Sequence, residues 1–220
     1  MIFFKTRSLA FLLSCLLILT SALAAHAETA EEILAKANSL DKDGFWEESV
    51  LEWEKLLKSN PENKLRTLAR LKLVKTYFKL GQFEQSVQTA KESAAENPES
   101  FHAFFHLANA LARTGNFPEA VEAFQKIVQL RPDEGLALVG LALSHFGNRD
   151  SQKAIERLKE SKVIFKKKKN IPWYQNARIM IPQIKDFARF PANFSDLWLE
   201  NNLKLVRETY EQALFDPENL

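Results

Sequence analysis

Three short phrases that each begin with glycine decide the fold of this chain: Gly44-Phe-Trp-Glu-Glu-Ser-Val, Gly81-Gln-Phe-Glu-Gln-Ser-Val and Gly115-Asn-Phe-Pro-Glu-Ala-Val. A proline follows each glycine 17 residues later, and the phrases are spaced by 37 and then 34 residues. The three prolines are Pro61, Pro98 and Pro132. Self-similarity at a fixed period of this size is the sequence signature of a repeat architecture. The sequence therefore predicts a structural unit that occurs several times in succession.

Each unit is predicted to be a helix, a tight turn and a second helix. The glycine supplies the positive φ that ends the first helix, and the proline cannot continue the second. In the third unit, apolar residues recur at helical spacing in both helices. They are Phe104, Leu107, Ala108 and Leu111, followed by Phe117, Ala120, Val121, Phe124 and Ile127.

A fourth, weaker unit keeps the same register. Ala142 and Ala154 stand 34 residues beyond the small residues Ala108 and Ala120 of the third unit. Small residues at these positions let two helices approach closely. In the fourth unit, however, Arg149 replaces the glycine.

These positions resemble the tetratricopeptide repeat, in which glycine, aromatic, small and proline residues recur with a period of 34. The matching residues are Gly44, Trp46, Ser49, Trp53 and Pro61; Gly81, Phe83, Ser86 and Pro98; Ala108, Gly115, Phe117, Ala120, Phe124 and Pro132; and Leu141, Ala142, Ala154 and Leu158. The resemblance covers about Ala30 to Lys168. It implies an all-α superhelical solenoid of about four repeats, at 30–63, 67–100, 101–134 and 135–168.

Residues 169–220 do not repeat and are predicted to form a C-terminal helical cap. Pro172, Pro182 and Pro191 divide their first part into short helices or one kinked helix. Ser195-Asp196 is a plausible N-cap for a last helix that stops at Asp216-Pro217. A solenoid needs a cap over its last apolar face, although this segment could instead be a separate binding element.

Residues 1–27 have the pattern of a secretory signal peptide. Lys5 and Arg7 precede an apolar run from Leu9 to Leu19, and Ala25-His26-Ala27 ends the segment with small residues. We expect cleavage near Ala27 and export to the periplasm. The alternatives are an uncleaved membrane anchor and a lipoprotein-type cut at Cys15. Cleavage after Ala27 would leave 193 residues with no cysteine and with 28 basic and 28 acidic side chains.

The composition of that mature chain argues against several function classes. A net charge of zero disfavours a general binder of nucleic acid or of anionic membranes. The sequence contains no nucleophile elbow, phosphate-binding glycine loop or paired CxxC. We therefore expect neither an enzyme nor a cofactor. His102 and His106 have the spacing of a metal-binding pair but lack the glutamate of HExxH, so we predict no metal site.

The first helix of each repeat is the candidate binding surface. In the tetratricopeptide family, positions 2, 5, 6, 9, 12 and 13 line a concave groove where peptides commonly bind. The residues at these positions that we assign to a peptide-binding groove are Asn38, Lys72, Lys75, Phe78, Lys79, His102, His106, Asn109 and Arg113. Cations that face a concavity favour anionic ligands such as carboxylates. The alternative is an ordinary solvated helix face.

The same positions of the fourth repeat are apolar instead of basic: Leu136, Val139, Gly140, Leu143 and Phe146. Either the C-terminal helices fold back over this strip or it binds an apolar or amphipathic partner. We favour the fold-back, because an uncovered strip of this length would promote aggregation.

The sequence thus predicts an exported scaffold that holds a peptide or partner protein. By analogy with similar exported repeat proteins, it would act in envelope assembly, secretion or pilus biogenesis. Two rival hypotheses remain: a structural accessory subunit held through its C-terminal helices, and a metal-binding protein based on His102 and His106. The sequence alone specifies neither the oligomeric state nor the partner.

Overall fold

The computed structural model describes residues 28–189 and 191–215, and every regular element among them is helical. The predicted signal peptide lies outside the described residues. In chain order the elements are α2 (Ala30–Asp43), α3 (Trp46–Lys58), α4 (Asn63–Lys79), α5 (Phe83–Glu96), α6 (Phe101–Arg113), α7 (Phe117–Leu130), α8 (Gly135–Gly147), α9 (Ser151–Lys167), α10 (Ile171–Asp186), the 3₁₀ turn η1 (Phe187–Arg189) and α11 (Ala192–Ala213).

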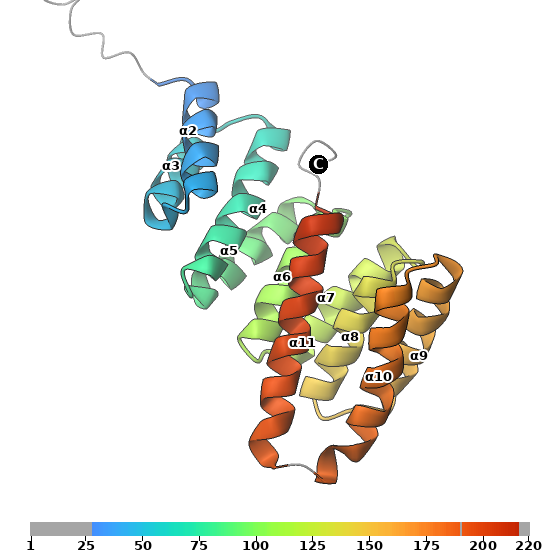
Figure 1. The fold of residues 1–220 in the computed structure, drawn as a ribbon. Coiled ribbons are helices and arrows are strands. Elements are labelled where there is room, and N and C mark those ends of the chain that lie inside the picture. Colours follow the sequence, from blue (N-terminus) through green and yellow to red (C-terminus); the bar gives the residue numbers. More distant parts are fainter. Residues whose placement is uncertain (1–27, 190, 216–220) are drawn as a thin grey trace, which may run out of the picture.

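The helices from α2 to α9 form four successive helical hairpins that stack side by side (Figure 1). The first helices of neighbouring hairpins also contact one another, α4 with α6 and α6 with α8. They therefore line the inner face of the stack. This arrangement confirms the predicted all-α solenoid with helices added at its C-terminal end.

The turns inside the hairpins share one backbone conformation. Gly44, Gly81 and Gly115 have φ values of 84°, 73° and 77°. The fourth turn has Arg149 at this position with a φ of 62°. A side chain in the left-handed region costs about 1–2 kcal/mol, so the fourth repeat keeps the turn geometry at some cost in stability.

The hydrophobic core consists of two clusters that meet at α4. Leu73 and Tyr77 of α4 belong to the smaller cluster, which includes Trp53 and the other buried residues of α2 and α3. Leu71 and Val74 belong to the larger cluster, which continues through all later helices to α11. The first repeat is thus packed against α4 alone, while the remaining repeats share one core with the C-terminal helices.

The C-terminal segment differs in detail from its prediction. α10 is one continuous helix with Pro182 inside it, which agrees with the single-helix alternative and not with several short helices. α11 begins one turn earlier than predicted, at Ala192, and its N-cap is Pro191. The predicted cap at Ser195-Asp196 is wrong because the amide of Phe194 already donates to the carbonyl of Pro191, at 2.9 Å.

α11 returns along the solenoid and packs on α8 and α6 (Figure 1). Its buried side chains are Trp198, Leu199, Leu203, Val206 and Tyr210. They belong to the same core as Leu136, Val139 and Leu143 of the apolar strip. The predicted fold-back over the fourth repeat is confirmed. Burial of each large apolar side chain contributes about 1.5–3 kcal/mol, so α11 is an integral part of the core.

Gly140 marks the closest helix approach near this strip. A β-carbon placed there would lie 2.2 Å from Cε1 of the buried Phe124 ring. We predict that Gly140→Ala lowers the free energy of unfolding by about 1–3 kcal/mol, the usual cost of overpacking. Urea denaturation followed by circular dichroism measures this change.

The control is the double variant Gly140→Ala/Phe124→Leu, in which a smaller side chain makes room for the added methyl group. It should lose less stability than the sum of the two single substitutions. Unchanged stability of Gly140→Ala would contradict the close packing of α7 on α8.

Candidate functional site

α11 covers the part of the inner face where the two candidate histidines lie. His102 and His106 of α6 are only 5% and 6% exposed. Nδ1 of His102 lies 2.8 Å from the hydroxyl of Tyr210 in α11. The Tyr210 ring also stacks on Phe105, with centroids 4.0 Å apart and planes 10° from parallel. Both histidines therefore take part in the packing between α6 and α11.

His106 is surrounded by aromatic rings and by positive charge. Its ring meets the rings of Tyr210 and Phe215 edge-on, at 5.3 and 5.4 Å between centroids. Burial, together with the smaller effects of nearby His102, Lys75 and Arg207, lowers the pKa of His106 to about 3. The imidazole is therefore neutral near pH 7. Within the described residues, no three His, Cys, Asp or Glu side chains are grouped so that they could hold a metal ion.

The three candidate lysines of α4 each have a partner. Lys72 lies 3.9 Å from a carboxylate oxygen of Asp41, and burial lowers the pKa of this lysine. Lys79 lies 3.8 Å from the centre of the Trp46 ring. Its pKa is also lowered, mainly by burial and by the charge of Lys75. The predicted cationic stripe thus exists, but the first repeat partly neutralises it.

Lys75 is instead linked to the C-terminal helix. Its Nζ lies 3.5 Å from Oε2 of Glu211 in α11. The other oxygen of Glu211 accepts a hydrogen bond from Arg207, at 3.0 Å. Glu211 therefore joins α4 to α11 through two cations.

The two candidate amides bond within their own helices. Nδ2 of Asn38 donates to the carbonyl of Leu34 at 3.0 Å, and Nδ2 of Asn109 donates to the carbonyl of Phe105 at 2.7 Å. Asn109 is buried and also borders the pocket described next. An amide oxygen is a hydrogen-bond acceptor, and the bonds above use only the amide nitrogens.

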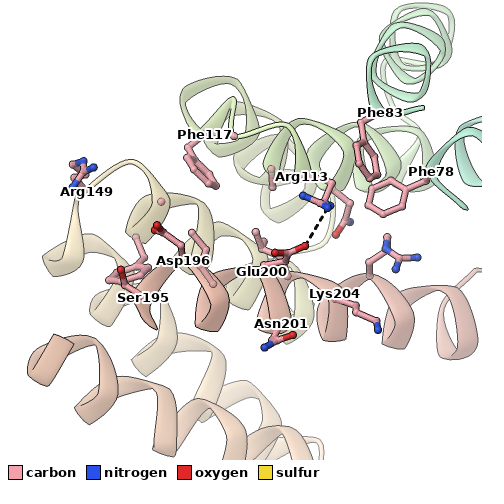
Figure 2. Close-up of a pocket in the computed structure, with 18 of the residues that line it drawn as sticks. Phe78, Phe83, Arg113, Phe117, Arg149, Ser195, Asp196, Glu200, Asn201 and Lys204 are labelled. Carbon is pink, nitrogen blue, oxygen red and sulfur yellow. Dashed lines mark ion pairs between the residues drawn. The ribbon is translucent and has the colours of Figure 1, made fainter. Parts of the chain in front are cut away.

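A pocket of about 860 Å³ lies between α11 and the turns of repeats two to four (Figure 2). Four aromatic rings line it: Phe78, Phe83, Phe117 and Phe146. Pockets of this size with apolar walls and a few convergent polar groups are typical ligand sites in proteins. The site has one wall made by the repeats and one made by the C-terminal helix.

Five basic and two acidic side chains border the same pocket, so its lining is predominantly cationic. The basic residues are Lys79, Arg113, Arg149, Lys204 and Arg207, and the acidic residues are Asp196 and Glu200. A concave, partly apolar site strengthens the effect of such charges on an approaching anion.

Two of the arginines are held against aromatic rings. The guanidinium carbon of Arg113 lies 4.4 Å from the centre of the Phe83 ring, and that of Arg207 lies 4.4 Å from the centre of the Phe78 ring. The two rings contact each other edge-on at 5.2 Å. Such cation–π contacts hold the guanidinium groups in place. An N–H group of Arg207 also donates to Glu211, within α11.

One ion pair crosses the pocket from the repeats to α11. Nη2 of Arg113 lies 3.1 Å from Oε1 of Glu200, and the two side chains are 39% and 51% exposed (Figure 2). The pair is therefore partly accessible to solvent, unlike the buried contacts of Tyr210.

The structure divides the predicted groove residues into three sets. Phe78, Lys79, Asn109 and Arg113 border the pocket. His102, His106 and Lys75 contact α11, and Asn38 and Lys72 lie in the first two repeats. Sequence reasoning missed the contributions of Arg149, Glu200, Lys204 and Arg207. The replacement of the turn glycine by Arg149 could have indicated a functional role for that residue. No local sequence pattern, in contrast, indicates which repeats α11 contacts.

Comparison with known proteins agrees with this architecture. Residues 71–135 match the family model described as tetratricopeptide repeat. The fold is a tetratricopeptide-repeat solenoid. A curated relative, small glutamine-rich tetratricopeptide repeat-containing protein 2 of Mycosarcoma maydis, is 29% identical over 121 residues, which are 52% of this chain. The matched part spans about a third of that relative, 34% of its length.

Solved tetratricopeptide structures share the fold at low sequence identity. MamA AMB-1 has a TM-score of 0.58 and 24% identity, with 68% of this chain and 87% of that chain covered. A second MamA structure has a TM-score of 0.64 and 19% identity, with coverage of 86% and 97%. YrrB, described as a TPR protein with an unusual peptide-binding site, has a TM-score of 0.57 and 21% identity, with coverage of 72% and 80%.

The buried His106 predicts a pH dependence of stability. Its pKa is about 3 in the folded chain, below the ordinary value of 6.5, so the unfolded chain binds more protons between these values. Its contribution to stability is complete above pH 6.5 and is lost as the pH falls toward 3. From pH 6.5 to 5 the free energy of unfolding should fall by about 2 kcal/mol through this residue.

The matched variant is His106→Gln, which removes the titration and keeps a polar side chain. Denaturant titrations at several pH values should give a shallower slope for the variant between pH 6.5 and 5. Parallel slopes for the two proteins would mean that His106 is not buried in its neutral form.

Proposed function

We propose that this protein is a non-enzymatic, exported interaction scaffold that binds a peptide or partner protein on its inner face. The observation that carries the proposal is the pocket between α11 and the turns of repeats two to four. It is the part of the inner face where aromatic rings and cations surround open space, whereas α11 covers the face around His102 and His106.

The chemistry of the pocket favours a partner with anionic groups. The aromatic rings offer apolar contact, and arginine is suited to planar carboxylates because its N–H groups form a fixed fork. YrrB is described as a peptide-binding TPR protein, which supports a peptide as the kind of ligand. No cofactor enters this proposal.

The proposed localisation is the periplasm, and this proposal is based on the sequence of residues 1–27. No helix in the described part of the chain combines the length and apolar character needed to cross a bilayer. For a periplasmic protein of this kind, we propose a role in envelope assembly, secretion or pilus biogenesis.

A second candidate is an accessory subunit that is held through the outer side of α11. Phe194, Leu197 and Leu205 of this helix are 39%, 57% and 39% exposed and offer apolar contact to a partner. In this case the pocket would not contribute to binding. The two candidate functions therefore predict that different surfaces must be altered to abolish binding of the partner: the pocket in the first case and the outer side of α11 in the second.

Arg149→Gly provides a sharp test of the pocket. The substitution removes one of the five cations and relieves the left-handed strain at the same residue, so stability should stay equal or rise. We predict that it weakens capture of the partner from the host envelope fraction at least threefold, as expected for loss of an ionic contact of about 1 kcal/mol. The captured proteins are identified by mass spectrometry. Each is then purified and titrated with the unaltered protein and with the variant, which gives the two dissociation constants.

The control is Lys169→Gly, which makes the same charge change at a left-handed residue with a φ of 56°, outside the pocket. Capture by this variant should equal that of the unaltered protein. Equal capture by Arg149→Gly and Lys169→Gly would contradict the pocket proposal. Loss of capture in Leu197→Lys/Leu205→Lys alone would instead support the accessory subunit.

A further inference from the structure

α11 supplies acidic side chains to the same cations that the repeats present on their inner face. Glu211 pairs with Lys75 at 3.5 Å, and Glu200 pairs with Arg113 at 3.1 Å. The two pairs differ in their surroundings. Glu211 is 12% exposed and also binds Arg207, so it is a structural contact, whereas Glu200 is 51% exposed.

The Arg113–Glu200 pair is weak enough for a ligand to replace. It joins one guanidinium nitrogen to one carboxylate oxygen, and both groups are more than a third exposed. Ion pairs of this kind stabilise a protein by about 0–1 kcal/mol. Arg113 also has a second contact that does not involve Glu200, because its guanidinium rests on the Phe83 ring.

The length of the pocket indicates the form of its ligand. Along α11 the lining residues run from Ser195 to Arg207 at helical spacing. At 1.5 Å per residue, this face of the helix is about 18 Å long. An extended peptide rises about 3.3 Å per residue, so roughly five residues fit alongside it.

The distribution of charges and rings indicates the composition of that peptide. Arg149 lies at one end of the pocket, Arg113 lies between the two ends, and Lys204 and Arg207 lie toward Phe78 at the other end (Figure 2). The rings of Phe83 and Phe117 lie on the repeat side between these cations. A peptide that contains both acidic and apolar side chains would match both features.

We infer that the pocket binds an extended acidic–apolar peptide segment whose carboxylate pairs with Arg113 in place of Glu200. Glu200 is then an internal competitor that lowers the affinity, and Arg113 is the residue that selects an acid. This inference rests on the proposed function and specifies the class of partner.

The test uses the full-length protein and two synthetic pentapeptides with blocked termini. The acidic probe alternates glutamate with phenylalanine and begins and ends with glutamate, and the neutral probe has glutamine at the acidic positions. Isothermal titration calorimetry measures the dissociation constant of each probe. The unaltered protein should bind the acidic probe at least tenfold more tightly than the neutral probe.

Glu200→Gln is the decisive variant. It should bind the acidic probe about two- to fivefold more tightly than the unaltered protein, the factor that corresponds to removal of a competing surface ion pair. Arg113→Gln should reduce the preference for the acidic probe more than Glu200→Gln raises it. The control is Glu160→Gln, which removes the carboxylate partner of Arg157 on α9, away from the pocket, and should leave the affinity unchanged.

Thermal unfolding of each variant separates binding effects from loss of α11 packing. Affinity that stays the same or falls in Glu200→Gln, with an unchanged melting temperature, would overturn the inference. So would equal binding of the two probes, or no binding of the acidic probe. The proposed function fails separately, if Arg149→Gly captures its partner as well as Lys169→Gly does.

Discussion

The packing of Tyr210 against α6 is the interaction on which the rest of the inner face depends. Its ring lies flat on Phe105, its hydroxyl reaches His102, and its edge meets His106. Four aromatic and polar groups are thereby removed from water together. The stacked rings and the contact between Tyr210 and His102 fix the position of α11 relative to the repeats, whereas Nε2 of His106 is buried in the same cluster without a hydrogen-bond partner among the described residues.

This position of α11 changes what the inner face can do. A cationic stripe on α4 and α6 would otherwise form one continuous groove, but α11 covers its middle and supplies Glu211 to Lys75. The open space that remains lies toward the turns, where Arg113 and Arg207 rest on phenylalanine rings. The helix that closes the solenoid is therefore also one wall of the candidate site. The first repeat stands apart from this unit, because its core is limited to α2, α3 and α4.

Local sequence patterns were sufficient for the repeats and insufficient for the site. Gly44, Gly81 and Gly115 could be identified because a left-handed turn residue favours glycine, and the structure has positive φ at all three. The fourth turn has the same backbone conformation although its residue is Arg149, so the position in the repeat determines the turn even without glycine. The fold-back of the C-terminal helices followed from the apolar strip of α8, which needed a cover.

The details that failed depend on contacts between distant residues. The groove positions of His102 and His106 were assigned to the inner face, but their contacts come from Tyr210, 108 and 104 residues further along the chain. The start of α11 was placed at Ser195 because capping preferences favour serine and aspartate, whereas the extended backbone of Pro191 begins the helix one turn earlier. Similarly, the pairing of Arg113 with Glu200 depends on the direction in which α11 crosses the repeats, and no local pattern specifies that direction.

The most direct measurement of the central claim is a double-mutant cycle between Phe105 and Tyr210. Denaturation of the unaltered protein, Phe105→Leu, Tyr210→Leu and the double variant gives the coupling free energy between α6 and α11. If α11 lies in the inner face, the stacked pair should be coupled by about 0.5–1.5 kcal/mol. Additive effects of the two substitutions, within a few tenths of a kcal/mol, would contradict the account.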